Sequence, residues 1–166
     1  MTKADEQFVE LASGKVSLAQ LEALTSVLPL ELDLIDADDN FSWYNQTIDR
    51  GSTAGLKKQL GQSVVKRFPD AAKWMPGMLY AFRKGKRNTA EVASNVDGQR
   101  VVTTYAALHD HQGHYLGTLV ISENVEHIAD LLSQHRFKDS TVPDAVTGAS
   151  SYESKEYQQF IDHFLQ

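Results

Sequence analysis

The sequence contains no cysteine, which excludes a disulfide framework, a thiolate nucleophile and a cysteine-ligated zinc site. It also lacks any run of about 18 apolar residues, the length that a membrane-spanning helix needs. The first residues do not show the basic and then apolar pattern of a secretory signal. We therefore expect a cytoplasmic protein that has no membrane partner.

Positive charge is scarce as well. The 16 lysines and arginines are outnumbered by 22 aspartates and glutamates, which gives a net charge of -6. Since nucleic-acid binding depends on cations that neutralise phosphates, we expect no nucleic-acid partner. The densest basic stretch, residues 83–87, falls where we predict a helix end, and cations there favour the helix dipole. An anionic partner for this stretch is the alternative.

Catalytic motifs are missing too. There is no glycine-rich phosphate loop, no G-x-S-x-G nucleophile elbow and no H-E-x-x-H zinc motif. We therefore expect that the chain is not an enzyme.

The N-terminal residues 1–27 are predicted to be a helical lead. Apolar residues within residues 5–13 indicate a first helix that ends at Gly14. A second helix begins at Ser17, because Gln20 stands three residues later in capping-box spacing. Pro29 stops that helix.

Period-two alternation then predicts five strands. Residues 30–35 and 41–44 form a hairpin around an Asp/Asn-rich turn, and a meander follows near the C-terminal end. Asp97-Gly98 favours a type I′ turn between the first two meander strands. The three meander strands are residues 89–95, 100–109 and 114–123, and a short helix covers residues 125–132.

The middle of the chain, residues 46–86, is predicted to be a series of short helices, because three glycines interrupt it. Pro76-Gly77 must kink the last helix or divide it in two. Its predicted buried stripe consists of Trp74, Met78, Leu79 and Phe82.

This order of elements and the amino-acid sequences of three peptides resemble those of a bacterial family of PAS domains that is often fused to hemerythrin-like domains. The first peptide is residues 28–36, together with residues 14–18 that precede it. The second is residues 105–110, and the third is residues 113–119 with their G-x-Y-L-G pattern. The resemblance implies an α/β (α+β) fold: a PAS-like five-stranded antiparallel sheet with short helices on one face. Helical N- and C-terminal extensions lie outside that core.

We divide the chain into the lead, a PAS-like domain over residues 28–133, a linker over residues 134–150, and a C-terminal helix over residues 151–166. That helix is amphipathic, and its apolar stripe must pack against the domain, against a second copy of the chain or against a partner. We expect a homodimer, and a protein partner that receives the signal. The stripe contains Tyr157, Phe160, Ile161, Phe164 and Leu165.

The resemblance implies a ligand cavity between the sheet and the helices. Many family members have Cys-His-Pro in the middle helices, but this chain has Arg67-Phe68-Pro69. Haem is not expected, because no histidine falls in those helices, and the ligand stays unnamed. The alternative is a filled core, since such side chains usually pack. The candidate cavity residues are Phe41, Trp43, Trp74, Met78, Phe82 and Tyr105.

Residues 144–150 resemble the peptide on which a flavin transferase attaches FMN through a phosphoester. By this resemblance Ser150 is the acceptor, and Asp144, Thr147 and Gly148 are recognition residues. The alternative is a capping box, in which Ser150 and Glu153 open the final helix. FMN is thus the one named cofactor candidate.

Two polar clusters resemble metal sites. His109, His111 and His114 fall within a predicted hairpin turn, where side chains diverge; a metal site or a pH-responsive role is the alternative. Asp36 and Asp38 resemble the start of a calcium loop, but the required glycine and glutamate are missing. We predict no metal site.

Three functions remain open. The first is a PAS-type sensory or ligand-binding module that acts through protein–protein contacts. The second is a flavin-carrying redox protein with FMN at Ser150, and the third is a dimerisation domain without a ligand.

Overall fold

The structure is a computed structural model, and it describes residues 7–47 and 54–137. The chain divides into two compact units, residues 1–126 and residues 127–166, and helix α5 crosses the boundary. None of the described helices is long and apolar enough to cross a membrane. The elements, in chain order, are β1 (Phe8–Leu11), β2 (Gly14–Ser17), α1 (Leu18–Val27), β3 (Glu31–Asp36), β4 (Phe41–Tyr44), α2 (Ala54–Lys57), α3 (Val64–Arg67), the 3-10 helix η3 (Pro69–Ala71), α4 (Met75–Arg83), β5 (Thr89–Val96), β6 (Gln99–His109), β7 (Tyr115–Asn124) and α5 (Glu126–Ser133).

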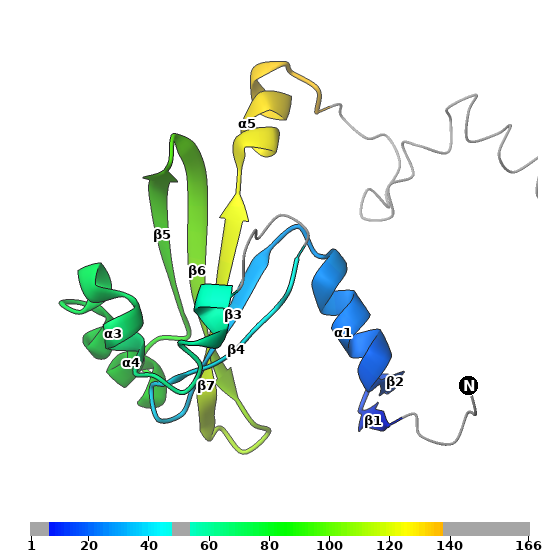
Figure 1. Ribbon diagram of the computed structural model, residues 1–166, viewed down its shortest axis with the longest axis vertical. Coiled ribbons are helices and arrows are strands. Elements are labelled where there is room, and N and C mark those ends of the chain that lie inside the picture. Colours follow the sequence, from blue (N-terminus) through cyan, green and yellow to red (C-terminus); the bar gives the residue numbers. More distant parts are fainter. Residues whose placement is uncertain (1–6, 48–53, 138–166) are drawn as a thin grey trace, which may run out of the picture. The chain divides into compact units, whose positions relative to one another are not determined.

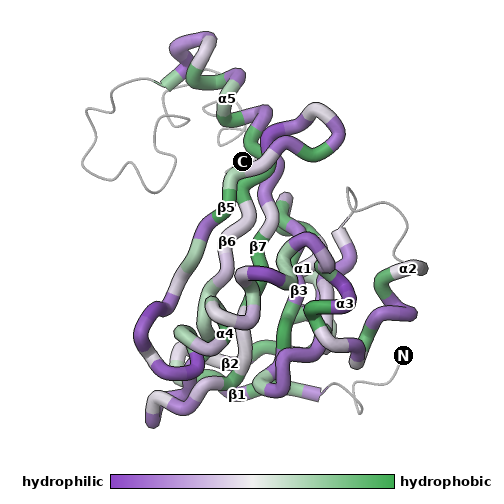
Figure 2. The backbone as a smooth tube through the Cα atoms, turned by 90° about the vertical axis from the view of Figure 1, so that its left-hand side faces the viewer, coloured by the Kyte–Doolittle hydropathy of each residue, from purple (hydrophilic) through white to green (hydrophobic). Residues whose placement is uncertain are grey.

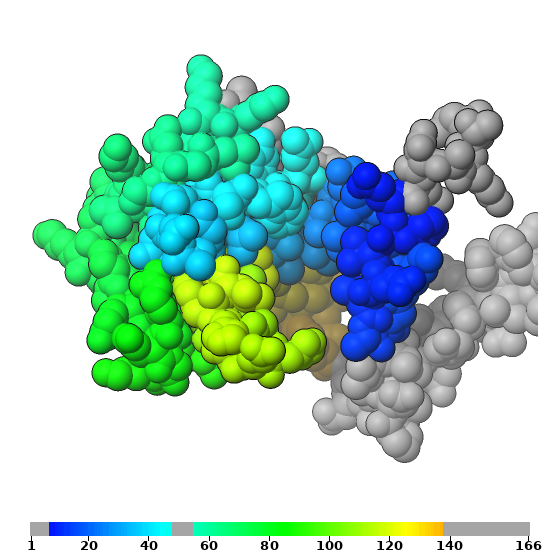
Figure 3. Space-filling view, turned by 90° about the horizontal axis from the view of Figure 1, so that it is seen from below, coloured from blue at the N-terminus to red at the C-terminus, as the bar shows by residue number. Residues whose placement is uncertain are grey.

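The first unit is built on a five-stranded antiparallel sheet with the strand order β4-β3-β7-β6-β5. Helices α3 and α4 lie over one face, which we call the inner face, and Figure 1 shows α1 on the other side of the sheet. Figure 2 looks onto the inner face and shows α4 in front of the lower part of the strands. Seen from below, the β3–β4 segment and the β6–β7 turn lie between the helical segment and the N-terminal segment (Figure 3). The five-stranded sheet with short helices is as expected from the sequence.

The hydrophobic core fills the space between the inner face and the helices. Strand residues Ile35 and Val120 contribute to it, and Met75 and Phe82 of α4 are completely buried. Burial of such side chains contributes about 1.5–3 kcal/mol each. The complete cluster is Ile35, Val64, Ala71, Met75, Leu79, Phe82, Tyr105 and Val120.

A buried ion pair joins the helical segment to the sheet. The Arg67 guanidinium at the end of α3 lies 2.8 Å from the Asp33 carboxylate on β3, and both side chains are only 9% exposed. The guanidinium also lies over the ring of Phe41, 4.0 Å from its centroid. Arg67 is therefore a largely buried residue at the junction between α3 and the sheet.

The strand boundaries and the helix at residues 18–27 were predicted closely. The Ser17 Oγ accepts a hydrogen bond from the Gln20 N–H (3.2 Å), and the Gln20 side chain accepts one from the Ser17 N–H (2.8 Å), which confirms the capping box. Asp97 and Gly98 both have positive φ, 49° and 81°, as a type I′ turn requires.

Two local predictions were wrong. Residues 5–13 are not a helix: residues 8–11 are a strand that pairs with residues 14–17, and Gly14 begins the second strand of this hairpin. Pro76 neither kinks nor divides α4, because it stands in the first turn, where its missing N–H is not needed. The buried positions of α4 are consequently Met75, Leu79 and Phe82.

Gly117, in the G-x-Y-L-G peptide, is fixed by its contact with the neighbouring strand. Its φ is 146°, and a Cβ atom there would collide with the carbonyl oxygen of Ile35. Only glycine allows β7 to approach β3 this closely, at the centre of the sheet.

Replacement of Arg67 by alanine should lower the free energy of unfolding by about 3–5 kcal/mol, because the Asp33 charge stays buried without its guanidinium. Arg83→Ala is the matched control: Arg83 pairs with Asp39 at 2.6 Å, but both side chains are about one third exposed. It should cost about 0–1 kcal/mol. Urea denaturation measures both, and equal losses would contradict the structural role of the buried pair.

Candidate functional site

The inner face changes character along its strands. Strand register places Asp33, Val120 and Tyr105 in one row across the sheet, next to the helices. The next row, two residues further along each strand, consists of Glu31, Ser122 and Thr103. The face is therefore apolar in its core half and lined with hydroxyl and carboxylate groups toward the β5–β6 turn.

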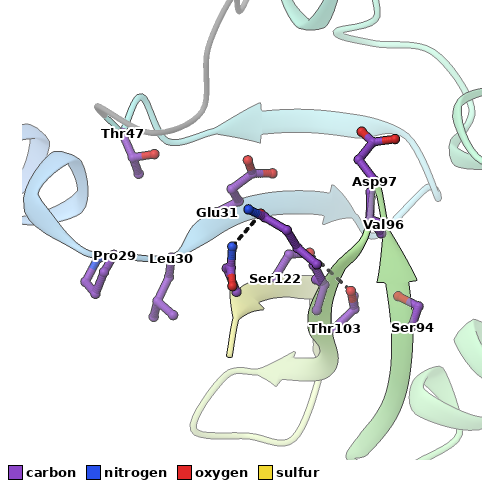
Figure 4. A pocket seen from close by; sticks show the side chains of 12 residues that line it. Pro29, Leu30, Glu31, Thr47, Ser94, Val96, Asp97, Thr103 and Ser122 are labelled. Carbon is purple, nitrogen blue, oxygen red and sulfur yellow. Dashed lines mark hydrogen bonds between the residues drawn. The ribbon is translucent and has the colours of Figure 1, made fainter. Parts of the chain in front are cut away.

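A pocket of about 470 Å³ lies over this polar half of the sheet (Figure 4). We call it the inner-face pocket. Its walls come from four strands, from the connection between α1 and β3, and from the residues after β4. It is lined by Pro29, Leu30, Glu31, Thr47, Ser94, Val96, Asp97, Gln99, Val101, Thr103, Ser122 and Asn124.

The polar side chains of this lining carry hydroxyl, amide and carboxylate groups. The hydroxyls of Thr103 and Ser122 lie 3.3 Å apart, and the Asn124 amide donates to the Gln99 side chain at 2.6 Å (Figure 4). Glu31 and Asp97 add two carboxylates, and the lining contains no lysine, arginine or histidine. Such a pocket favours a ligand that donates hydrogen bonds or carries positive charge.

Burial near the border between the two halves affects one titratable group. Burial raises the pKa of the Tyr105 hydroxyl, and the nearby negative charge of Asp33 raises it further. Tyr105 therefore stays protonated at neutral pH, and its ring packs edge-on against Trp74 with centroids 5.5 Å apart.

The six candidate cavity residues do not line the inner-face pocket. Phe41, Phe82 and Tyr105 are buried and Met78 is half-buried. Trp43 and Trp74 are exposed, and Trp43 lines a separate pocket between α1 and β4. A ligand role for these six residues stays a prediction.

The residues of the inner-face pocket were not predicted from the sequence. The signal was present in β6, where Val101, Thr103 and Tyr105 alternate with outward-facing residues. A hydroxyl at such a position is visible in the sequence. Which face of the strand the helices cover is decided only by the tertiary fold.

The histidine-rich segment is a polar turn, as predicted. The Asp110 carboxylate accepts hydrogen bonds from the backbone N–H groups of Gln112 and His114, and it lies 2.9 Å from the His114 Nδ1. The hydrogen bond from His114 lowers the pKa of Asp110. No group of three metal-ligating side chains occurs within residues 7–47 and 54–137. The peptide from Asp144 to Ser150 that resembles an FMN-attachment site lies outside the described residues, as do the end of the predicted linker and the predicted C-terminal helix.

Comparison with known proteins identifies the fold. The sequence profile of the PAS domain family matches residues 21–126. The crystal structure of a C-terminal domain from Streptococcus mutans is 24% identical, with 76% of this chain and 98% of that chain covered and a TM-score of 0.66. No curated protein sequence matches the chain significantly.

Two structures of VqmA from Vibrio cholerae are also similar. The VqmA dimer in the absence of target DNA is 23% identical, covers 70% of this chain and 56% of VqmA, and has a TM-score of 0.51. The complex of VqmA with a ligand and DNA is 17% identical, covers 76% and 61%, and has a TM-score of 0.50.

The sheet, the helices on its inner face and the profile match together define a PAS-type domain, a fold typical of sensory signalling modules and generally not catalytic. The chain belongs to the PAS domain family.

Proposed function

We propose that this PAS domain is a sensory module that binds a small polar ligand in the inner-face pocket and signals through contacts with other protein chains. The observation that carries the proposal is the hydroxyl- and carboxylate-lined volume of about 470 Å³ beside a packed apolar core. Ligand pockets in proteins are typically about 300–1,000 Å³. The VqmA complex with a ligand supports this proposal, since that chain shares the fold.

The lining restricts the chemistry of the ligand. Two carboxylates and three strand hydroxyls offer acceptors, whereas an anion would meet no basic side chain in the lining. The ligand class that fits is a small molecule with several N–H or O–H donors, such as a hydroxylated amine. We place the module in the cytoplasm, as expected from the sequence.

The apolar surface of the N-terminal segment supports a homodimer. Helix α1 contains no buried residue, and its leucines are 41–54% exposed. A helix with so much apolar surface and one charged residue, Glu22, is normally covered. A second copy of the chain is the partner that we propose, because the VqmA structure with the same fold is a dimer.

FMN attachment at Ser150 is a second candidate function. The Asp144-to-Ser150 peptide is the observation that favours it. A covalently bound flavin would make the chain a redox carrier, in which the PAS domain serves as the folded scaffold.

Filling the inner-face pocket should abolish ligand binding. Thr103→Leu places a larger apolar side chain beside Ser122, and should weaken binding at least about tenfold, or 1.4 kcal/mol. Thr104→Leu is the matched control, because the neighbouring residue faces the other side of the sheet. Native mass spectrometry of protein from its own host should show a non-covalent mass on the wild type and on Thr104→Leu only. A mass retained by Thr103→Leu would contradict the pocket assignment.

A charge among the exposed leucines of α1 (Leu18, Leu21 and Leu24) should dissociate the dimer. Leu24→Glu introduces a charge on α1, where Leu24 is 54% exposed. Leu116→Glu is the control, because Leu116 is equally exposed, at 55%, but belongs to β7 and not to α1. Sedimentation velocity should show a monomer for Leu24→Glu and a dimer for the control. A monomeric wild type, or two dimeric variants, would refute the α1 interface.

The FMN proposal is tested by mass. Co-expression with a flavin transferase should add a mass that survives denaturation and absorbs as a flavin. Ser150→Ala should lose it, and Ser151→Ala, the adjacent serine, should keep it. An unmodified wild type, or a modified Ser150→Ala variant, would rule out this acceptor.

A further inference from the structure

The Asn45 side chain is hydrogen-bonded to α1, to β3 and to the connection between them. Asn45 follows β4 directly and is 1% exposed. Its Oδ1 accepts a hydrogen bond from the Leu32 N–H at 2.8 Å. Its Nδ2 donates to the Leu30 and Thr25 carbonyl oxygens, both at 2.9 Å.

The Thr25 bond matters because of its place in α1. Thr25 lies in the last turn of this helix, where carbonyl groups have no partner within the helix. Asn45 supplies that partner. No residue of α1 is fully buried, and its half-buried residues, Thr25 and Ser26, lie at this C-terminal end, so the Asn45 bond adds a polar contact where the helix meets the rest of the unit.

The Leu30 bond matters because of the inner-face pocket. Leu30 lines it, and so does Thr47, two residues after Asn45. The two chain segments that Asn45 joins are therefore both pocket walls. A ligand that displaces either wall changes the geometry of the Asn45 hydrogen bonds.

We propose that Asn45 couples occupation of the inner-face pocket to the position of α1, the helix that carries the exposed apolar stripe. The proposal rests on the proposed function, because it assigns the route by which pocket occupation reaches that surface. The hydrogen bond from the Leu32 N–H holds the Asn45 side chain on β3, and the bond from its Nδ2 to the Leu30 carbonyl changes when the pocket wall moves. Asn45 is thus a positioning residue and does not contact the ligand.

The absence of cysteine allows a test that does not need the natural ligand. In Thr103→Cys the single thiol lies in the pocket, and in Thr104→Cys it lies on the opposite face of the same strand. Methyl methanethiosulfonate converts either thiol to a methyl disulfide and releases methanesulfinate. Intact mass confirms complete labelling of each full-length protein.

Hydrogen exchange of the α1 amides is the readout, with the β6 amides as an internal reference. Labelling of Thr103→Cys should change α1 exchange by about two- to tenfold, the effect of roughly one hydrogen bond. Labelling of Thr104→Cys should leave it unchanged. No change in α1 after complete labelling of Thr103→Cys would overturn the coupling.

The role of Asn45 itself is tested in the Thr103→Cys background. Asn45→Asp keeps an acceptor for the Leu32 N–H but removes both amide donors, so that labelling should no longer alter α1 exchange. A persisting response would overturn the assignment to Asn45. If the buried carboxylate prevents folding, the side-chain amide NMR signals of Asn45 replace this variant. They should shift on labelling, and unshifted signals together with an altered α1 would equally overturn it.

These results separate the coupling from ligand binding. Loss of the native ligand mass in Thr103→Leu, without an α1 response in labelled Thr103→Cys, would leave the ligand proposal standing and remove the coupling. An α1 response without any native ligand mass would leave the coupling standing and remove the ligand proposal.

Discussion

The ion pair between Asp33 and Arg67 organises the domain. It places the Arg67 guanidinium from the end of α3 against the Asp33 carboxylate on β3, and both side chains are largely buried. A buried charge pair is not a strong source of net stability, but it is intolerant of rearrangement, since either charge alone is costly to bury. The position of the Arg67 guanidinium over the Phe41 ring adds β4 to the same junction. The β3–β4 hairpin and α3, which follows it about 20 residues later in the sequence, thereby meet at one junction.

The same junction marks the border between the apolar, packed half of the inner face and its polar half, which lines the pocket. Asp33 shares its row with Val120 and Tyr105, and the next row begins the pocket. Asp33 is paired with Arg67 in the core, whereas the carboxylates of Glu31 and Asp97 line the pocket. A fold that serves many ligands can keep its core packing constant while the residues one row further along the strands define specificity.

Much of this fold could be read from the sequence, and the reasons are local. Strand alternation, the Ser17–Gln20 box and the Asp97–Gly98 turn are short-range signals that tertiary contacts did not override. Residues 8–11 were misread because four residues are too few to separate a helical from a strand pattern, and Gly14 fits either a helix end or a hairpin. The pocket was missed for a different reason: the hydroxyls of Thr103 and Ser122 meet only through strand register and through the choice of the covered face. The partner of Arg67, which lies 34 residues earlier in the chain, could not be predicted from spacing.

The position of β3 beside β7 has a consequence for synthesis. The two central strands join residues 31–36 to residues 117–122, so the sheet closes only when the last strand has left the ribosome. Until then β3 presents an unpaired edge, a feature that invites wrong association between nascent chains. The β3–β4 hairpin and the short helices come earlier in the chain, but the core that they share includes Val120 and Tyr105, so this core is complete only once β6 and β7 are available. A new chain therefore has to carry the open edge of β3 through synthesis of the whole β5–β7 meander.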